Sequence, residues 1–491
     1  MPTAAWLAVA GLAFLALQLP LRNYIVDDAY IHLTFARNLA AGEGFSFNPG
    51  EPTYGVTAPL WTLLLALVGS LVGFTPALAK ILSILFSVLT IPMVHRLSGA
   101  MGLSRKGSLC VALIWAVEVW LVRWTAAGME TSLALLLLLL AFDAQLELRA
   151  RAGFFLGLAA LCRPETAPLA VIFALDTARE AGWRRGLAVL AITLAVVAPW
   201  LIYAALEFGA VIPNPARVKG LGLPPPGDLI MGLKRTAAII GGAHLVELSV
   251  IGLGVFGVFG RLVKAGADIA RKLGLLLVWA LFPPVVLLAQ DVIISSRYLL
   301  LGLPPLTLAA FLMLETESQN GTGFHLRRYT GVLTALIIAL QLSLTLLITL
   351  PHVRAFGSTS AALQQLADYL RNKTPAGASV AVGDVGIIGY SSGRKVIDLE
   401  GLVSPAIIPH RLQGQYDSLI VKNYFLKAAH PDYLIDRSRV PERLRGQVGA
   451  AYHPLLTIPV KGGRVDTAAE EWYYTLYALT DTVGGYHRMN E

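Results

Sequence analysis

The sequence predicts a polytopic α-helical membrane protein that ends in a small α/β domain. Of its 491 residues, 56% are hydrophobic and 14% are charged, whereas a typical soluble domain carries about 25% charged residues. Apolar runs near the length of helix that crosses a bilayer recur through residues 1–351. Residues 352–491 are polar and alternate helical with strand-like patterns. We therefore expect a transmembrane domain at 1–351 and a soluble domain at 352–491.

Ten apolar runs are candidate membrane spans, and an eleventh at 58–73 is short for a crossing. The ten lie at 4–20, 76–95, 108–124, 131–146, 153–178, 187–205, 236–260, 274–290, 299–315 and 330–350. The first run has no basic segment before it and no clear cleavage site, so we expect a transmembrane helix rather than a signal peptide. The run 153–178 contains Pro164, which cannot donate a helical hydrogen bond and clashes with the preceding turn. We expect it to bend at Arg163-Pro164-Glu165 and to form two short spans.

The placement of Lys and Arg predicts the orientation of these spans. Basic residues gather in five loops, at residues 96–106, 149–151, 179–185, 261–272 and 327–328. All five fall on one face if 58–73 does not fully cross and 153–178 forms two spans. Loops rich in Lys and Arg usually face the cytoplasm, so this arrangement leaves the first loop, 21–57, and the C-terminal domain on the extracytoplasmic side of the cell membrane. The net charge of +8 is thereby assigned to contacts with an anionic membrane surface. We expect no nucleic-acid partner.

The C-terminal domain shows one helical pattern and several short strands. Leu363, Leu366 and Leu370 share one face of a helix over 361–371, and strands are expected at 379–384, 395–399 and 433–436. The stretch from Gly383 to Gly386 does not match the spacing of a phosphate-binding glycine loop, and no helix clearly follows it. It is interpreted as a turn at the end of a strand. Two further acids of this domain are either surface groups or part of an acceptor cleft: Asp398 and Glu400.

The first loop carries the densest chemical signal, in the run Asp27-Asp28-Ala29-Tyr30-Ile31-His32. Two adjacent carboxylates at the mouth of a transmembrane helix are costly unless they are solvated, paired or used. One of them can act as a general base on a hydroxyl group. The alternative is that they cap an interfacial helix, because acidic groups are favourable at a helix N-terminus. The two roles are compatible.

Motifs along nearly the whole chain resemble one enzyme superfamily. They are the Asp27-Asp28-Ala29-Tyr30 loop with its Gly42 to Glu51 run and Pro59-Leu60-Trp61 ending, Gly128 to Thr131, Leu161 to Glu165, Ile212 to Pro215, Ser296-Arg297-Tyr298 and Gly383 to Tyr390. Together they resemble the GT-C superfamily of integral membrane glycosyltransferases, which use polyprenyl-phosphate sugars. The resemblance is greatest to bacterial relatives of the protein mannosyltransferases and of terminal arabinofuranosyltransferases.

The resemblance implies a GT-C-like helical bundle that moves one monosaccharide from a polyprenyl-phosphate carrier to an acceptor hydroxyl, with inversion. The partners would be that donor, membrane lipid, and a glycan, lipid or protein acceptor. The superfamily's first-loop acid corresponds to Asp27 or Asp28; Asp27 is favoured because the first acid of such pairs usually acts. A second acid is expected on another external loop, where Glu130 fits by topology or simply begins a helix. The superfamily has metal-dependent and metal-independent members, so a divalent metal ion is left open.

Several basic residues lie on the predicted external side, against the general trend: Arg163, Arg217, Lys219 and Arg297. Arg163 and Arg297 abut apolar segments, where an unpaired cation is costly. A lipid phosphate would compensate them, and arginine suits phosphate oxygens; internal pairing, for instance of Arg163 with Glu165, is the alternative. Candidate substrate contacts also include Glu165 beside Arg163, Tyr298 beside Arg297, and Tyr30 and His32 beside the acids. Tyr30 is otherwise an interfacial anchor, and His32 is otherwise structural.

A transporter or flippase of a lipid-linked or small polar substrate is the rival interpretation, because external arginines and broken helices suit both. It predicts inverted repeats and acids near the middle of the membrane. The sequence shows no such repeat, and its acids lie at the ends of the spans. The two cysteines, Cys110 and Cys162, lie in apolar runs and provide neither a disulfide framework nor a metal motif.

Overall fold

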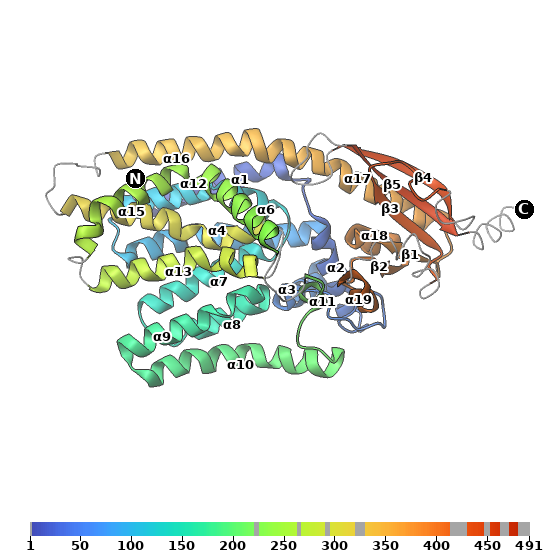
Figure 1. Ribbon diagram of the computed structural model, residues 1–491, viewed down its shortest axis with the longest axis horizontal. Helices are drawn as coiled ribbons and strands as arrows, with labels where there is room; N and C mark the ends of the chain where they lie inside the picture. Colours follow the sequence, from blue (N-terminus) through green and yellow to red (C-terminus); the bar gives the residue numbers. More distant parts are fainter. Residues whose placement is uncertain are drawn as a thin grey trace, which may run out of the picture. The chain divides into compact units, whose positions relative to one another are not determined.

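A computed structural model describes residues 2–219, 225–262, 267–289, 295–319, 329–412, 430–445, 452–461 and 471–479. The described chain is mainly helical, with one five-stranded sheet (Figure 1). Its contacts divide it into two compact units. The helical unit contains Met1–Arg22, Lys80–Trp200 and Leu221–Thr349; the α/β unit contains Asn23–Ala79, Leu201–Gly220 and Leu350–Glu491. The division assigns most of the first loop to the same unit as the C-terminal segment.

Among the described residues, six helices are long and apolar enough to cross a membrane, or up to eight if each of two bent pairs forms one span. The six spans are Thr3–Leu21, Pro76–Met101, Trp183–Phe208, Pro226–Gly252, Asp268–Leu288 and Thr330–Lys373. The first is formed by α1 (Thr3–Gln18) and a short 3-10 turn, and the second and third are α4 and α10. The fourth and fifth lie within α12 (Pro226–Leu262) and α13 (Ala267–Ala289). The bent pairs are α5 (Arg105–Ala116) with α6 (Val119–Ala126), and Ser296–Gly302 with Pro304–Glu315.

Two of the expected spans form helices that are shorter than a membrane-crossing helix. The run 131–146 forms α7 (Thr131–Leu146), and the run 153–178 forms α8 (Ala152–Cys162) and α9 (Leu169–Ala181) with a 3-10 turn, Pro164–Thr166, between them. The predicted break at Arg163-Pro164-Glu165 is confirmed, since Arg163 leaves the helical conformation with φ −144°. The last expected span, 330–350, is also different: helical conformation continues from α16 (Thr330–Leu344) to the end of α17 (Leu350–Lys373).

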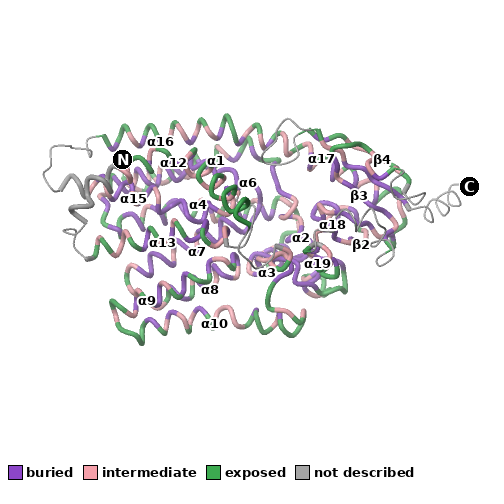
Figure 2. Tube along the Cα trace, in the orientation of Figure 1, coloured by how far each residue is buried: buried purple, intermediate pink, exposed green. Residues whose placement is uncertain are grey.

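Exposed positions recur along α10 and α16 (Figure 2), and large apolar residues are among the exposed residues of the helical unit. Leu12 of α1 is 67% exposed, Leu194 of α10 is 64% exposed and Leu336 of α16 is 54% exposed. Apolar area of this extent is unfavourable in water and favourable against lipid tails. Together with the spans, it places the chain in a membrane, as the composition predicted.

Close helix packing in the helical unit depends on two glycines of α8. A Cβ atom on Gly153 would lie 2.2 Å from the Val189 carbonyl oxygen of α10, and one on Gly157 would lie 2.6 Å from Val196 Cβ. Small residues four positions apart let two membrane helices approach each other closely. Helices α8 and α10 therefore pack at a separation that excludes larger side chains.

A buried polar network connects two breaks in this unit, one between α5 and α6 and one at His244 of α12. Nδ1 of His244 lies 3.2 Å from Oε1 of Glu247, and its Nε2 lies 3.7 Å from Glu118. Gln341 of α16 accepts a hydrogen bond from the Val119 N–H and donates one to the Ala243 carbonyl. Polar groups that the breaks leave without helical partners are satisfied in this way.

The sheet of the α/β unit has the strand order β2-β1-β3-β5-β4. The first three strands, β1 (Ser379–Val382), β2 (Lys395–Asp398) and β3 (Tyr433–Ser438), are parallel and confirm the expected strands. Strands β4 (Tyr452–Lys461) and β5 (Glu471–Leu479) were not predicted, and they add an antiparallel ribbon. Leu363, Leu366 and Leu370 are buried on α17, as their spacing predicted.

The first loop folds onto the C-terminal elements of the α/β unit. It contains α2 (Asp27–Ala40), and α3 (Pro59–Val72) follows it. The Asn48 side chain donates a hydrogen bond to the Val396 carbonyl oxygen and accepts one from the Val396 N–H, and both bonds are 2.9 Å long. Asn48 thus pairs with strand β2 as a neighbouring strand would. Phe47 lies where a Cβ on Gly389 would be only 2.3 Å from its ring.

We predict that Gly157→Ala destabilises the protein by about 1–3 kcal/mol, because the added methyl group overlaps Val196 of α10. Gly274→Ala in α13 is the matched control, since a Cβ at that position meets nothing within 4 Å. The control should be neutral or slightly stabilising, as Ala favours helices over Gly. Thermal unfolding in detergent measures both, and equal melting temperatures for the two variants would contradict the packing argument.

Candidate functional site

Asp27 begins helix α2, and its carboxylate binds the first turn of another helix, α18 (Val385–Ser392). Oδ2 accepts a hydrogen bond from the Gly386 N–H and Oδ1 accepts one from the Ile387 N–H, both at 2.8 Å. The N–H groups in the first turn of a helix have no partner within the helix. Asp27 satisfies two of them and holds the N-terminus of α2 against that of α18.

The contact needs a glycine at position 386. A Cβ atom there would lie 2.0 Å from the Asp27 carbonyl oxygen and 2.8 Å from its Cγ. Any other residue would push the two helices apart. The Gly383-Asp384-Val385-Gly386 motif is thus explained by the close approach of Asp27, although its spacing is not that of a nucleotide-binding loop.

The sequence interpretation of this motif needs one correction, because a helix does follow it. Strand β1 ends at Val382 and α18 begins at Val385, so the turn lies between a parallel strand and a helix N-terminus. Such a terminus attracts anions, since its N–H groups and the helix dipole both favour negative charge. Here the anion is the side chain of Asp27.

The surroundings of Asp27 raise the pKa of its carboxyl group from 3.8 to about 7. Removal from water contributes most and the nearby charge of Asp384 comes next, while the hydrogen bonds from Ile387 and Gly386 act in the opposite direction. Asp28 adds a smaller increase. A carboxylate whose pKa lies near neutral pH is suited to take a proton from a substrate and release it again.

Asp384 is a member of this site that the sequence did not single out. It precedes α18, accepts a hydrogen bond from the Tyr474 hydroxyl of β5, and lies 3.4 Å from Nη1 of Arg437 of β3. Burial raises the pKa of Tyr474 well above its ordinary value, so the phenol stays a hydrogen-bond donor. The available signals were its position directly after a predicted strand, where sites in α/β folds often lie, and its place in the Gly383 to Tyr390 motif.

The other first-loop candidates lie close to Asp27 in sequence and contact different partners. The ring of Tyr30 packs edge-on against Tyr390 of α18, with the centroids 5.3 Å apart. His32 is buried, and its Nδ1 lies 2.8 Å from the hydroxyl of Thr62 in α3. Tyr30 is therefore at the junction of α2 and α18, while His32 lies between α2 and α3.

A second group of candidates lies in the helical unit, around Arg163. Its Nη2 atom is 2.7 Å from Oε1 of Glu130 and 2.9 Å from the hydroxyl of Thr131, and Nη1 is 3.5 Å from Glu165. Glu130 also immediately precedes α7. The sequence offered a lipid phosphate or internal pairing as the partner of Arg163; the structure shows internal pairing, with Glu130 nearer than the expected Glu165.

Arg297 belongs to a neighbouring stack of aromatic and cationic side chains. Its guanidinium lies 5.0 Å from the ring centroid of Tyr298 and 5.9 Å from that of Trp124. Arg163 lies on the same Tyr298 ring at 5.2 Å. Arg123 was not predicted: it is 4% exposed, packs 5.0 Å from the Trp124 ring, and its Nε has no hydrogen-bond partner within the described part of the chain. Its position inside the apolar run 108–124 was the signal that could have identified it.

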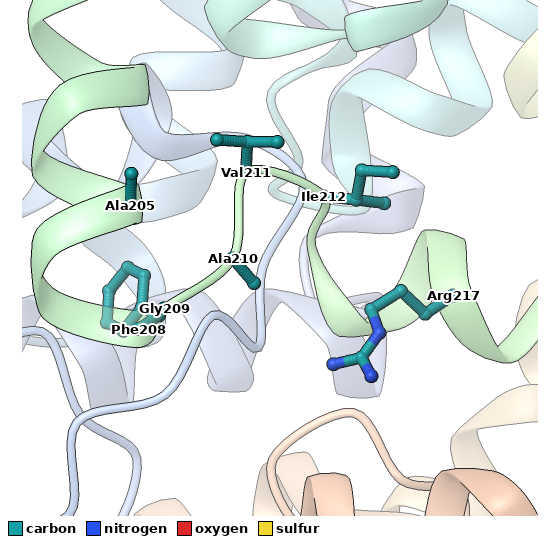
Figure 3. A pocket seen from close by; sticks show the side chains of 7 residues that line it. All are labelled: Ala205, Phe208, Gly209, Ala210, Val211, Ile212 and Arg217. Atoms are coloured by element: carbon teal, nitrogen blue, oxygen red, sulfur yellow. The ribbon is translucent and has the colours of Figure 1, made fainter.

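Arg217 lines a cavity of about 530 Å³ in the α/β unit (Figure 3). The other lining residues are Ala205, Phe208, Gly209, Ala210, Val211 and Ile212. The lining side chains are thus apolar apart from one guanidinium, which belongs to α11 (Asn214–Lys219). Lys219 ends this helix, and its side chain lies outside the described residues.

Asp398 is neither of the two things that the sequence left open. It is fully buried, and its carboxylate accepts hydrogen bonds from the N–H groups of Glu400 and Val403, both 2.8 Å long. Burial raises its pKa to about 6. Asp398 therefore orders the turn after β2. Over the described ranges, no group of three or more His, Cys, Asp or Glu side chains is arranged to hold a metal ion.

Comparison with known proteins places this geometry in context. A family model described as a domain of unknown function, DUF8728, matches residues 352–480. The terminal β-(1→2)-arabinofuranosyltransferase of Mycobacterium tuberculosis is 31% identical over 227 residues, which is 40% of this chain and 35% of that protein. The matched region thus spans about a third of the length of this relative.

Solved structures share the fold at low identity. The crystal structure of ArnT from Cupriavidus metallidurans in the apo state aligns with a TM-score of 0.58 at 14% identity, over 97% of each chain. ArnT bound to undecaprenyl phosphate gives 0.53 at 12% identity, again over 97% of each chain. The mycobacterial arabinofuranosyltransferase AftD gives 0.53 at 18% identity, over 96% of this chain and 41% of that one. The chain therefore shares the fold of these proteins, as the resemblance of its motifs to the GT-C superfamily implied.

We predict that Gly386→Ala lowers the melting temperature, because the new methyl group would overlap the Asp27 backbone and separate α2 from α18. Gly357→Ala in α17 of the same unit is the control, since a Cβ there meets nothing within 4 Å. Scanning fluorimetry of the two purified variants gives the comparison. A Gly386→Ala protein as stable as the Gly357→Ala protein would show that α2 and α18 are not held this closely.

Proposed function

We propose that this chain is a glycosyltransferase that moves one monosaccharide from a polyprenyl-phosphate carrier to an acceptor hydroxyl. The observation that carries the proposal is the first-loop carboxylate of Asp27, whose pKa is raised to about 7 on a chain with the GT-C fold. The relatives support it, because they include arabinofuranosyltransferases and a protein bound to undecaprenyl phosphate. They lend no support to the transporter alternative.

Asp27 is the general base of the proposed reaction. Each carboxylate oxygen has two lone pairs, and each gives one to a backbone N–H of α18. A lone pair on either oxygen can therefore take the proton of the acceptor hydroxyl. As the acceptor oxygen bonds to the anomeric carbon, the bond from that carbon to the phosphate oxygen breaks and its electron pair leaves with the phosphate. One such displacement inverts the anomeric carbon.

Negative charge that develops on the departing phosphate needs a cation, and the stack of Arg297, Tyr298, Trp124 and Arg123 offers two guanidinium groups. Planar guanidinium groups bind phosphate oxygens through paired hydrogen bonds. Arg163 is assigned a different role, because Glu130 already neutralises it at 2.7 Å. Arg163 packs against the Tyr298 ring and is not proposed to contact the phosphate directly.

The cavity beside Arg217 is proposed to hold a ligand that is apolar over most of its length and anionic at one end. Its lining, one guanidinium among apolar groups, fits a lipid-linked substrate of this kind. We further propose that this unit faces the extracytoplasmic side, on the basis of the distribution of Lys and Arg. Chelation with EDTA before the transfer assay tests whether a divalent metal ion takes part.

We predict that Asp27→Asn lowers sugar transfer by about 10²- to 10⁴-fold, the usual contribution of a general base. Asp28→Asn should cost less, because the carboxylate of Asp27 is the one bound to α18. The assay uses the purified chain in lipid with a panel of radiolabelled polyprenyl-phosphate sugars. Asp368→Asn, on the exposed pair with Arg371, controls for loss of one charge. Full turnover by both first-loop variants, with the fold intact, would rule out this mechanism.

We predict that Arg297→Lys reduces transfer about tenfold or more, although the charge is kept, because an ammonium group cannot stack on Tyr298 and Trp124 as a guanidinium does. Arg149→Lys, an exposed arginine paired with Glu147 in the same unit, is the matched control. Steady-state kinetics with the donor varied provide the measurement. Equal values for the two Lys variants would exclude Arg297 from the donor site.

A further inference from the structure

The C-terminal segment contributes more to the surroundings of Asp27 than the two N–H groups that bind its carboxylate. The turn that presents the Gly386 and Ile387 N–H groups also carries Asp384, one residue before α18. A second carboxylate beside a base opposes the loss of the base's proton, because two like charges then share a partly buried site. An acid in this position is unfavourable unless other groups stabilise it.

Two side chains of the sheet stabilise Asp384. Tyr474 of β5 donates its hydroxyl hydrogen to Oδ2, and Nη1 of Arg437 of β3 lies 3.4 Å from the same oxygen. Arg437 itself packs 5.7 Å from the ring centroid of Tyr474 and 5.3 Å from that of Trp472. The side chain of Arg437 is 22% exposed, so its charge is only partly screened by water. Negative charge on Asp384 is thus held by groups from two strands.

We propose that Asp384, fixed by Tyr474 and Arg437, is a positioning residue for Asp27: it keeps a second negative charge beside the base and sets the pH at which that base becomes active. The inference rests on the proposed role of Asp27. It assigns to the C-terminal segment a direct share in the chemistry of a residue in the first loop.

The charged and titratable groups around Asp27 come from several elements. They are Asp28 and Tyr30 of α2, Asp384 before α18, Tyr390 of α18, Arg437 of β3 and Tyr474 of β5. Burial raises the pKa of each of these tyrosines, so they remain neutral where Asp27 titrates. After burial itself, Asp384 is the largest contribution to the raised pKa of Asp27, ahead of Asp28.

The first test is the pH profile of kcat/KM for sugar transfer by the whole 491-residue chain. The wild type should lose activity below about pH 7, where Asp27 takes up its proton. Asp384→Asn should move this acid limb to lower pH by about one unit, and Tyr474→Phe should move it less in the same direction. Asp384→Glu, which keeps the charge, should return the limb toward that of the wild type. Asp368→Asn should leave it in place.

The second test needs no activity. In the folded protein Asp27 keeps its proton up to about pH 7, whereas the unfolded chain releases it near 3.8. The folded state therefore binds more protons between these values, and Asp27 makes stability fall as pH rises from about 4 to 7. Asp27→Asn removes this contribution. Melting temperatures are measured at pH 4 and pH 7 for the wild type, both single variants and the Asp27→Asn/Asp384→Asn double variant. These four proteins form a double-mutant cycle, which gives the effect of Asp27→Asn with and without Asp384.

The two tests separate this inference from the proposed function. If the pH-dependent effect of Asp27→Asn is smaller in the Asp384→Asn background, Asp384 acts on Asp27 whether or not sugar is transferred. If the effect is the same in both backgrounds, or the acid limb of Asp384→Asn coincides with that of the wild type, the inference is overturned. No transfer from any donor, with a positive stability cycle, would overturn the proposed function alone.

Discussion

The hydrogen bonds between the Asp27 carboxylate and helix α18 are the interaction on which the α/β unit depends. They join the first loop to the C-terminal elements, and they explain the glycine at 386 and the position of Tyr30 against Tyr390. Asn48 strengthens the same junction by pairing with the backbone of β2. The anion that a helix N-terminus of this kind usually receives from a ligand is supplied here by the chain itself.

The parts of the fold that follow local rules could be predicted from the sequence. The break at Arg163-Pro164-Glu165 follows from the geometry of proline, and the strands β1, β2 and β3 follow from short apolar runs between turns, although their parallel pairing was not predicted. The partner of Asp27 could not be predicted, because the Gly386 N–H lies 359 positions away in the sequence. The same holds for Tyr474, which lies on β5, a strand that the sequence pattern did not indicate.

In the helical unit, buried charged side chains pair with one another. Arg163 and Glu130 are 5% and 3% exposed, and breaking a buried pair of this kind typically costs about 3–5 kcal/mol. The sequence correctly required an anion for Arg163 but could not decide between an internal and an external one. Glu118, His244 and Glu247 show the same internal solution at the breaks of α5–α6 and α12. Such pairs fix where helices bend without recourse to lipid headgroups.

Asp27 and the N–H groups that bind it lie far apart in the sequence, and this distance constrains how the protein is made. Helix α2 leaves the ribosome early, but its N-terminal carboxylate finds its partners only after the segment around Gly386 has been synthesised and has folded. A nascent chain that stops among the membrane spans would carry the acidic pair without the groups that tune it. The surroundings of Asp27 are therefore complete only after the downstream segment has folded, so truncated products are expected to insert in the bilayer with this carboxylate unbound.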